Sequence, residues 1–296
     1  MILVIGDIIL DKYSYGSIER INPEVPVPVI HVKREEYVLG GAANVALNCL
    51  AMGSDVQLIG SMGKDFAALK ITELAMAHRL PLHGLEHSGL STVKQRFVSQ
   101  EFAQQILRAD FEQIAALSQQ DVERIRSLVQ EARPKYILLA DYGKGVISDD
   151  LVTTLLKLGI PLLVDPKPKN MTLYKGVHIL KPNRKELEES FGKLSDEALK
   201  ECAKLMDAQI VCTLGSEGAV LATEKEVTHF SARKVEVIDV CGAGDTFIAC
   251  LAAQLDQGVS LKDAVRTANL AASIAVSKKQ TAIVSKEELA NAEERL

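Results

Sequence analysis

The sequence of 296 residues contains no tryptophan, and its aromatic residues amount to only 4%. That is too few for the base-stacking platforms of nucleic-acid-binding proteins or for the aromatic girdles of membrane proteins. Positive charge is not in excess either, because 34 Lys and Arg stand against 39 Asp and Glu, a formal net charge of -5. Such a chain has no global positive field to attract nucleic acid or an anionic membrane. We therefore expect neither of them as a partner.

Long apolar runs and a secretory leader are also missing. No run approaches the roughly 18 residues that span a bilayer, and the chain begins with the strand-like MILVIGD. We therefore expect a cytoplasmic protein. None of the cysteines forms a C-x-x-C pair and all lie among aliphatic residues, which predicts reduced, buried thiols at Cys49, Cys202, Cys212, Cys241 and Cys250.

A metal site at His83 and His87 is not expected. The two histidines have the spacing of ligands on one helix face, but Pro81 and Gly84 argue against a helix there, and no third ligand stands nearby.

Short apolar runs alternate with amphipathic stretches of helical length along most of the chain. The runs lie at 2–5, 56–59, 136–140, 160–164, 177–180 and 210–213, and the predicted helices at 42–52, 65–79, 119–132, 148–158 and 195–206. This alternation predicts a mostly parallel sheet covered by helices on both faces. After residue 240 the pattern indicates consecutive helices at about 243–256, 260–278 and 286–294.

Two segments interrupt this pattern, residues 12–39 and residues 91–110. Both are expected to be extended. Pro23, Pro26 and Pro28 exclude the first segment from a central strand, but they suit a sheet edge or a protruding flap. One small β-sheet built from both segments beside the core is the economical interpretation, and it predicts a lid over a cleft.

The strongest local pattern is DVCGAGDT at 239–246, where the strand-like VEVID is followed by a long apolar helix. The backbone amides of Gly242, Ala243 and Gly244 would point along the helix axis at its positive end, which suits a phosphoryl group. Asp245 would stand beside this anion hole, as a general base toward a substrate hydroxyl. An ordinary strand-to-helix turn, with Asp245 as a helix cap, is the alternative for this octet alone.

Polar residues and glycines gather near two further elements. Gly40 and Gly41 open an apolar helix in which Asn44 would offer a donor and an acceptor to a polyol. Asp7 and Asp11 stand at the expected end of the first strand, where an open α/β sheet meets its substrate. Taken singly, each is better explained as an ordinary helix start or strand end, because glycines at helix starts and Asp after strands are common.

Later strand ends carry similar residues. Asn183 and Glu186 share the first turn of an expected helix, and their oxygens could orient a hydrated Mg²⁺. Thr213, Gly215 and Gly218 follow the strand QIVC and form a plausible seat for a nucleotide. Because the carboxyl ends of parallel strands meet at one edge of the sheet, we expect these residues to lie in one crevice, together with DYGKG at 141–145 and DPK at 165–167.

Several well-known motifs are absent from the sequence. There is no G-x-x-x-x-G-K-[ST] loop, no H-R-D or D-F-G set, no G-x-G-x-x-G after the first strand and no G-x-S-x-G elbow. P-loop, protein-kinase, dinucleotide-binding and serine-hydrolase interpretations therefore lose their main support.

In their order and spacing, the motifs resemble those of the ribokinase-like (PfkB) carbohydrate kinases along essentially the whole chain. They are Gly40-Gly41 with Asn44, Asn183-x-x-Glu186, Thr213-x-Gly215-x-x-Gly218 and Gly242-Ala243-Gly244-Asp245. The resemblance implies one kinase domain over 1–296, an α/β/α sandwich of three layers. Its central sheet would be mostly parallel, and a small β-sheet lid would come from about 12–39 and 91–110.

Within this family, several segments are similar to those of kinases that act on D-glycero-D-manno-heptose 7-phosphate, among them QQILRADFE, LADYGKGV and VDPK. This similarity implies ATP-dependent phosphorylation of the anomeric (C1) hydroxyl to heptose 1,7-bisphosphate, in ADP-heptose synthesis for lipopolysaccharide. Such kinases are often fused to a nucleotidyltransferase domain, whose H-x-G-H motif is not found here. Another sugar or sugar-phosphate kinase, ribokinase-like or phosphofructokinase-like, is the alternative. A non-catalytic nucleotide or sugar sensor is a further one.

The resemblance also implies roles for individual residues. Asp245 would be the base, and the amides of Gly242, Ala243 and Gly244 the anion hole. Sugar hydroxyls would be bound by Asp11, Gly40, Gly41 and Asn44. Asn183 and Glu186 would position Mg²⁺ through water, and ATP would lie along Thr213, Gly215 and Gly218. Val240 replaces the threonine found in many members.

Two further expectations concern the lid. The phosphate already on the sugar needs a cationic partner, and the candidates are Lys94, Arg96 and Arg108, although solvated strand charges explain these residues equally well. The lid would also expose edges and apolar residues, which predicts a homodimer that covers Val25, Val27 and Val29.

Overall fold

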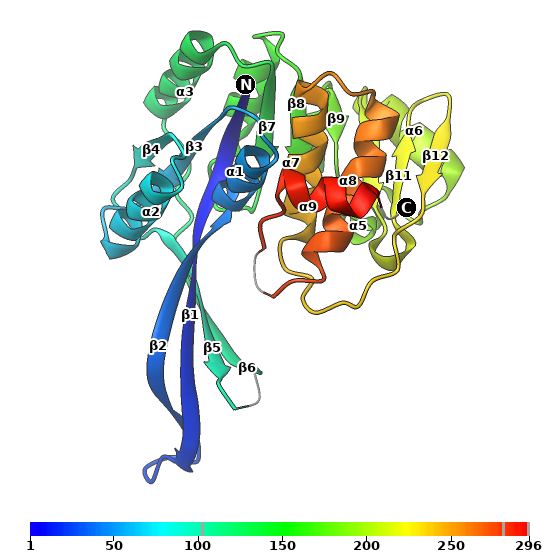
Figure 1. Ribbon diagram of the computed structural model, residues 1–296. Helices are drawn as coiled ribbons and strands as arrows, with labels where there is room; N and C mark the ends of the chain where they lie inside the picture. The colour runs from blue at the N-terminus through cyan, green and yellow to red at the C-terminus, as the bar shows by residue number, and fades with distance from the viewer. Residues whose placement is uncertain (102–103, 280–281, 295–296) are drawn as a thin grey trace.

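A mostly parallel β-sheet runs through the body of the protein (Figure 1). The computed structural model describes residues 1–101, 104–279 and 282–294. The strand order is β12-β11-β10-β9-β8-β7-β1-β3-β4, and β11 and β12 are antiparallel to their neighbours. The bounds are β1 (Ile2–Ile21), β3 (Val56–Met62), β4 (Leu82–Glu86), β7 (Tyr136–Ala140), β8 (Leu162–Asp165), β9 (Ile179–Leu180), β10 (Gln209–Thr213), β11 (Ala219–Ala222) and β12 (Val227–Phe230).

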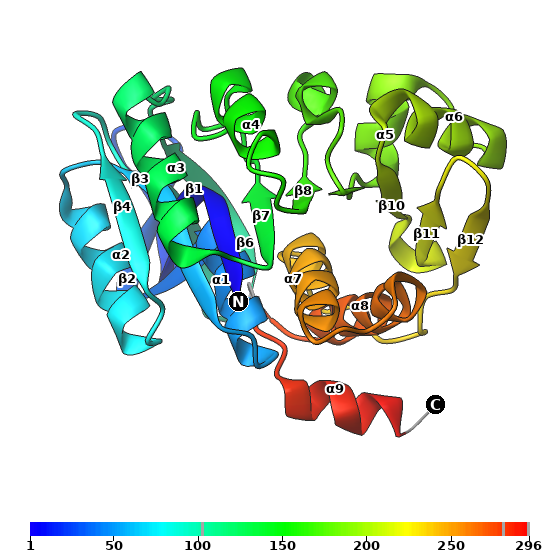
Figure 2. The same ribbon diagram turned by 90° about the horizontal axis from the view of Figure 1, so that it is seen from above.

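Helices cover both faces of this sheet, as Figure 2 shows. One face packs against α1 (Ala42–Ala51), α2 (Phe66–Ala77), α7 (Ala243–Asp256) and α8 (Leu261–Ala275), and α9 (Lys286–Glu293) packs on the outside of α8. The other packs against α3 (Gln119–Ala132), α4 (Asp149–Leu156), η1 (Pro168–Tyr174), α5 (Arg184–Phe191) and α6 (Asp196–Met206). Side chains of β1 alternate between the two cores, with Ile2 and Val4 in one and Leu3 and Ile5 in the other. The predicted three layers are confirmed.

A second, smaller sheet protrudes from the body (Figure 1). Strand β1 continues beyond the main sheet and pairs with β2 (Pro28–Gly41) on one side and β5 (Thr92–Ser99) on the other, and β5 pairs with β6 (Gln105–Phe111). We call the outer part of β1, from residue 8 on, with β2, β5 and β6 the lid sheet. Residues 102–103, within the expected lid segment 91–110, lie outside the described residues.

The structure corrects the interpretation of the first lid segment. Residues 12–16 do lie in a central strand of the lid sheet, because β1 runs there between β2 and β5, whereas residues 17–21 pair with β2. The prolines permit this because Pro23 and Pro26 lie in the turn between β1 and β2, and Pro28 begins β2 at the sheet edge. For the same reason Asp7 and Asp11 do not stand at a strand end. Both lie within β1.

Three other local predictions are wrong. The segment VEVID at 235–239 forms no strand, and the expected strand at 177–180 is reduced to Ile179–Leu180. Cys241 is exposed, because it lies in the turn before α7 instead of inside an element, whereas the other four cysteines are buried as predicted.

None of the helices in the described ranges is long and apolar enough to cross a membrane.

Candidate active site

The amino-terminal ends of α1 and α7 meet at the edge of the main sheet. Each helix follows a glycine in the left-handed region, Gly41 with φ 59° and Gly242 with φ 76°. Neither helix has a side-chain cap, whereas the other α-helices of the described ranges begin with a Ser, Asp or Asn side chain that accepts a first-turn amide. No side chain therefore competes with an anion for the first-turn amides of α1 and α7. The Ala243 amide donates a long hydrogen bond of 3.4 Å to the carbonyl oxygen of Val240.

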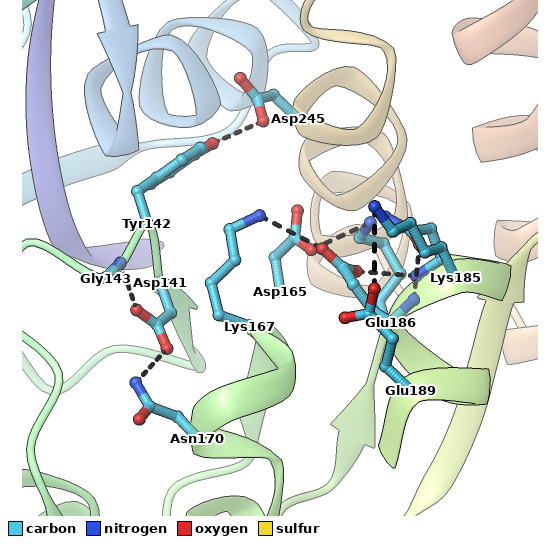
Figure 3. A network of polar contacts seen from close by, with 12 residues as sticks. Asp141, Tyr142, Gly143, Asp165, Lys167, Asn170, Lys185, Glu186, Glu189 and Asp245 are labelled. Atoms are coloured by element: carbon cyan, nitrogen blue, oxygen red, sulfur yellow. Dashed lines mark hydrogen bonds and ion pairs between the residues drawn. The ribbon is translucent and has the colours of Figure 1, made fainter. Parts of the chain in front are cut away.

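The carboxylate of Asp245 lies on the first turn of α7 and is held from two sides. Its Oδ2 accepts a 2.7 Å hydrogen bond from Asn44 Nδ2, and its Oδ1 accepts a 2.5 Å hydrogen bond from the hydroxyl of Tyr142 (Figure 3). Burial raises the pKa of Asp245, while the two hydrogen bonds oppose this rise. Asp245 is thus a fixed carboxylate with an increased affinity for a proton.

The orientation of the Asn44 amide is itself determined by its surroundings. Asn48, one turn later on α1, donates 3.1 Å from Nδ2 to Asn44 Oδ1, so the NH₂ group of Asn44 points to Asp245. The Oδ1 of Asn48 in turn accepts from the backbone amide of Val284 at 3.1 Å. The predicted pairing of Asn44 and Asp245 at one site therefore rests on buried packing between α1 and α7.

Tyr142 was not identified from the sequence, and the loop that carries it is held by Asp7. The carboxylate of Asp7 accepts hydrogen bonds from the backbone amides of Tyr142, Lys144 and Val146 at 2.8, 3.0 and 3.1 Å. Burial raises the pKa of Asp7, and these three amides oppose the rise. Asp7 therefore supports the loop after β7 and does not present its oxygens to a substrate, in contrast to the expectation from the sequence.

A buried ion pair lies behind the first turn of α7. Lys181 Nζ and Asp165 Oδ1 are 3.1 Å apart. A Cβ atom on Gly244 would stand at ordinary contact distances of 3.6 Å from Lys181 Nζ and 4.0 Å from Asp165 Oδ2, so this pair lies directly beside the turn. Burial raises the pKa of Asp165 to about 6, with Asp245 adding to the rise and Lys181 opposing it. Lys181, too, was not singled out from the sequence.

Asn183 and Glu186 share the first turn of α5, as predicted, and form a capping box. Asn183 Oδ1 accepts from the Glu186 amide and Glu186 Oε2 accepts from the Asn183 amide, both at 2.9 Å. The Nζ of Lys167 lies 3.2 Å from the other oxygen of Glu186 (Figure 3). In the described part of the chain, no cluster of three or more His, Cys, Asp or Glu side chains could hold a metal directly.

A cavity of about 870 Å³ extends from Asn183 to the first turn of α7. Thr213, Gly215 and Gly218 line one part of it, and Ala243 and Gly244 another, together with Val235, Val237 and Val240 of the loop before α7. Its volume suits a nucleotide-sized ligand. Gly218 is required there because its φ is 108° and a Cβ would stand 1.9 Å from the carbonyl oxygen of Phe230.

The three candidate lid cations share one face of the lid sheet with Asp11, but their partners differ. Lys94 pairs in register with Asp11, and Arg96 with Arg108. Arg96 forms an ion pair with Asp11. Arg108 lies 2.8 Å from Asp110 on the exposed strand β6.

Lys94 differs from both arginines. Within the described residues it has no ion pair, and burial lowers its pKa, with Arg108 and Arg96 adding to the effect and Asp11 opposing it. The lid face therefore carries an unpaired, partly buried ammonium group beside two arginines.

Asp11 connects the lid face with the site on α7. Its charge adds to the rise in the pKa of Asp245, and its Oδ2 would stand 2.3 Å from a Cβ on Gly40. Gly40 therefore makes room for Asp11. Among the described residues, neither Lys94 nor Arg108 contacts Asp245. These two predicted phosphate-binding cations therefore lie on the lid sheet, apart from the site on α7.

Comparisons with known sequences agree with this arrangement. A sequence profile of the pfkB family carbohydrate kinases matches residues 1–288. The bifunctional protein HldE of Ectopseudomonas mendocina is 41% identical over 308 residues, covering 99% of this chain and 64% of that protein. HldE of Bradyrhizobium diazoefficiens is 39% identical over 305 residues, with coverages of 97% and 62%. The chain thus spans somewhat less than two thirds of the length of these relatives.

Solved structures show the same fold at low sequence identity. Phosphofructokinase-2 of Escherichia coli, in complex with substrates and products, has a TM-score of 0.83 at 19% identity, covering 100% of this chain and 99% of that one. The ribokinase of Arabidopsis thaliana, complexed with ribose and ATP, has a TM-score of 0.76 at 21% identity, covering 98% and 97%. The predicted ribokinase-like fold class is confirmed.

Proposed function

Because the chain belongs to the pfkB family of carbohydrate kinases, we propose that it phosphorylates D-glycero-D-manno-heptose 7-phosphate at its anomeric hydroxyl, with ATP as donor. The oxygen at C1 attacks the γ-phosphorus of ATP, its O–H bond breaks, and ADP leaves. The products are heptose 1,7-bisphosphate and ADP. The heptose is proposed from the likeness of QQILRADFE, LADYGKGV and VDPK to heptose kinases.

The observation that carries the kinase proposal is the meeting of two uncapped helix ends around one carboxylate. Asp245 takes the proton from the sugar hydroxyl as the general base, and its raised pKa favours that transfer. The amides of Gly242, Ala243 and Gly244 receive the charge of the transferred phosphoryl group. Phosphoryl transfer depends mainly on alignment and charge stabilisation, which rigid helix ends supply.

Sugar hydroxyls are bound beside the base. Asn44 touches Asp245 directly, and Asp11 lies close enough to influence its charge. The backbone at Gly40 and Gly41 packs closely against β1. A side chain on Gly40 would collide with Asp11, and one on Gly41 would collide with the backbone of Asp7. The sugar would therefore lie between α1 and the lid sheet.

ATP is proposed to occupy the cavity along Thr213, Gly215 and Gly218, with its phosphates toward Gly244. The apolar side chains of Val235, Val237 and Val240 suit an adenine ring. A related ribokinase structure was solved with ribose and ATP, which supports this assignment by fold.

The residues present also fit a Mg²⁺ ion held through water. Three carboxyl groups lie near one another in this region, since the charges of Glu186 and Asp245 both raise the pKa of Asp165. Their negative charge favours a cation. Glu186 and Asn183 already bind each other, so they would orient the water shell of the ion instead of replacing it. Mg²⁺ would supply neutralisation of the phosphate charge.

The 7-phosphate of the sugar is assigned to Lys94, Arg96 and Arg108 on the lid face. Lys94 is the strongest candidate, because Arg96 is tied to Asp11 and Arg108 to Asp110. An ammonium group without an ionic partner gains most from a phosphate.

This proposal places the chain in ADP-heptose synthesis for lipopolysaccharide, in the cytoplasm where ATP is available. Another sugar or sugar-phosphate kinase of the family is the alternative, since the identity of the sugar depends on sequence likeness alone. A non-catalytic sensor is less well supported, because Asp245 and its two hydrogen-bond donors are intact. The lid sheet is proposed to form a homodimer.

A panel of sugars tests the proposal. The protein is offered ATP and Mg²⁺ with heptose 7-phosphate, ribose, fructose, fructose 1-phosphate and fructose 6-phosphate in turn, and phosphorus NMR locates the new phosphate. We expect turnover on heptose 7-phosphate with the phosphate at C1. Turnover on a fructose phosphate alone would reject the heptose, and no turnover on any sugar would favour the sensor.

A further inference from the structure

The phenol of Tyr142 is the direct partner of Asp245 to which the proposed function assigns no role. Its hydroxyl donates the 2.5 Å hydrogen bond to Asp245 Oδ1 (Figure 3), while Oδ2 accepts from Asn44. Each carboxylate oxygen has two lone pairs. Both donors can therefore remain in place while a substrate hydroxyl approaches the same carboxylate.

The loop that carries Tyr142 is held in place at both of its ends. Asp7 in the middle of β1 accepts the amides of Tyr142, Lys144 and Val146. At the far end of the loop, Gly145 has φ 109°, and a Cβ there would stand 2.4 Å from the carbonyl oxygen of Ala115. The loop is thus held by a buried carboxylate and by close backbone packing.

The Tyr142 ring also faces the phosphate side of the site. Lys167 Nζ lies 5.7 Å from the centre of the ring and 3.2 Å from Glu186 Oε1. In Figure 3 the end of the Lys167 side chain lies between the Tyr142 ring and Glu186. The phenol therefore joins the proposed base to the proposed metal-orienting group.

Burial and the charge of Asp245 raise the pKa of Tyr142 well above its ordinary value. The phenol consequently stays protonated at any working pH and remains a donor. A neutral donor stabilises the ionised carboxylate without adding a positive charge that would attract the phosphates to the base.

We propose that Tyr142 is the positioning residue of the general base, which keeps Asp245 ionised and turned toward the sugar hydroxyl. This inference rests on the proposed function, in which Asp245 receives the hydroxyl proton. During that step the proton moves from the sugar oxygen to Asp245, and Tyr142 keeps its own proton.

Tyr142→Phe removes the hydroxyl and retains the ring. Without this donor the ionised form of Asp245 is less stable, so the acid limb of the kcat/KM profile moves to higher pH. On that limb kcat/KM falls about tenfold more than on the plateau, as expected for loss of a hydrogen bond to a charged group. Incorporation of 3-fluorotyrosine at position 142, a stronger donor, moves the limb the opposite way.

Tyr174→Phe is the matched control. Its hydroxyl donates 2.7 Å to Asp141 in the same buried region and does not touch Asp245. We expect this variant to lose stability but to keep the acid limb in place. An equal displacement of the limb in both variants would overturn the proposal, because it would show a general structural effect.

A measurement on the free protein separates this inference from the proposed function. The side-chain carboxyl carbons are labelled with ¹³C-aspartate, and the Asp245 signal is assigned by its loss in Asp245→Asn. We expect its titration to move to higher pH in Tyr142→Phe. An unchanged titration overturns the role of Tyr142 whatever the substrate is. A moved titration with no turnover on any sugar overturns the proposed function instead, and supports the effect of the phenol on Asp245.

Discussion

The side-chain amide of Asn44 donates a 2.7 Å hydrogen bond to Asp245, although 201 positions separate the two residues in the chain. The contact brings the first turns of α1 and α7 together, and with them the two glycine turns that the sequence marks. The helix proposed to bind the sugar and the helix proposed to bind the phosphate thereby meet at one carboxylate. The chemistry we propose depends on this junction.

The first prediction concerns that carboxylate. Asp245→Asn keeps the size of the side chain but cannot accept the hydroxyl proton, so turnover falls by at least about a hundredfold. ATP binding, measured by calorimetry, is retained because the cavity residues are unchanged. Asp149→Asn, a first-turn aspartate on the exposed face of α4, is the control. A near-normal rate for Asp245→Asn would remove the residue from the role of base.

The second prediction concerns the sugar phosphate. Lys94→Gln removes the unpaired ammonium group of the lid face, and we expect the KM for a sugar phosphate to rise about tenfold, the usual effect of losing a charged hydrogen bond. The KM for ATP is unchanged. Lys33→Gln removes an exposed charge from β2, on the other side of β1 in the same sheet, and is the control. An equal effect of both variants would mean that general lid charge, and not Lys94, attracts the substrate.

The third prediction tests the contact between Gly40 and Asp11. In Gly40→Ala the new Cβ would stand 2.3 Å from Asp11 Oδ2, so the carboxylate must move and its pairing with Arg96 is disturbed. The KM for the sugar rises while the KM for ATP stays constant. In the control Gly84→Ala, the nearest atom is the end of the flexible Met62 side chain at 2.5 Å, which can move aside. Unaltered sugar kinetics in Gly40→Ala would exclude Asp11 from sugar binding.

The sequence was sufficient to predict the features that depend on neighbouring residues. Glycines followed by an apolar run predicted the turns at Gly41 and Gly242, since only local backbone freedom is involved. The alternation of strands and helices likewise predicted the layers. The sequence did not predict that β1 continues into the lid sheet. Nothing in the sequence of β1 marks the point where it stops pairing with strands of the main sheet, such as β3, and starts pairing with strands of the lid sheet, such as β2.

The features that were missed depend on strands that are distant in the sequence. Tyr142 is one polar residue after an apolar run, and its importance follows only from the pairing of β7 with β1, at the point where the strand order reverses. The segment VEVID has strong strand propensity, but the loop it belongs to lines the large cavity instead of pairing with a neighbour.

The fourth prediction is a dependence of stability on pH. Burial raises the pKa of Asp165 to about 6, so between about pH 4 and pH 6 the folded protein holds a proton that the unfolded chain has released. Ionised Asp165 therefore destabilises the fold, and this cost appears as pH rises. Relative to the unsubstituted protein, Asp165→Asn should gain roughly 2 kcal/mol in free energy of unfolding between pH 4 and pH 7. Urea denaturation at several pH values measures it.

The comparison between pH values removes the constant effect of the substitution, such as the loss of the partner of Lys181. Asp149→Asn again is the control, because its side chain is exposed at the start of α4, away from Asp165 and Lys181 in the sequence. A difference between Asp165→Asn and the unsubstituted protein that is the same at pH 4 and pH 7 would contradict the raised pKa.

The last prediction is that the lid sheet forms a homodimer. Strands β2 and β6 are its two edges, and Val25 and Val27 at the tip of the β1–β2 turn are 53% and 48% exposed. Unpaired edges next to exposed apolar side chains favour association. Light scattering at micromolar concentration should give twice the chain mass of 32.2 kDa.

The double variant Val25→Lys, Val27→Lys should shift that equilibrium toward the monomer, because two charges would have to be buried in the interface. Leu205→Lys alters a side chain that is 60% exposed on α6, far along the chain from the lid, and should leave the mass unchanged. A monomer in the unsubstituted protein contradicts dimerisation altogether. A dimer that survives in the double variant, or dissociates equally in the control, would place the interface on another surface than the lid tip.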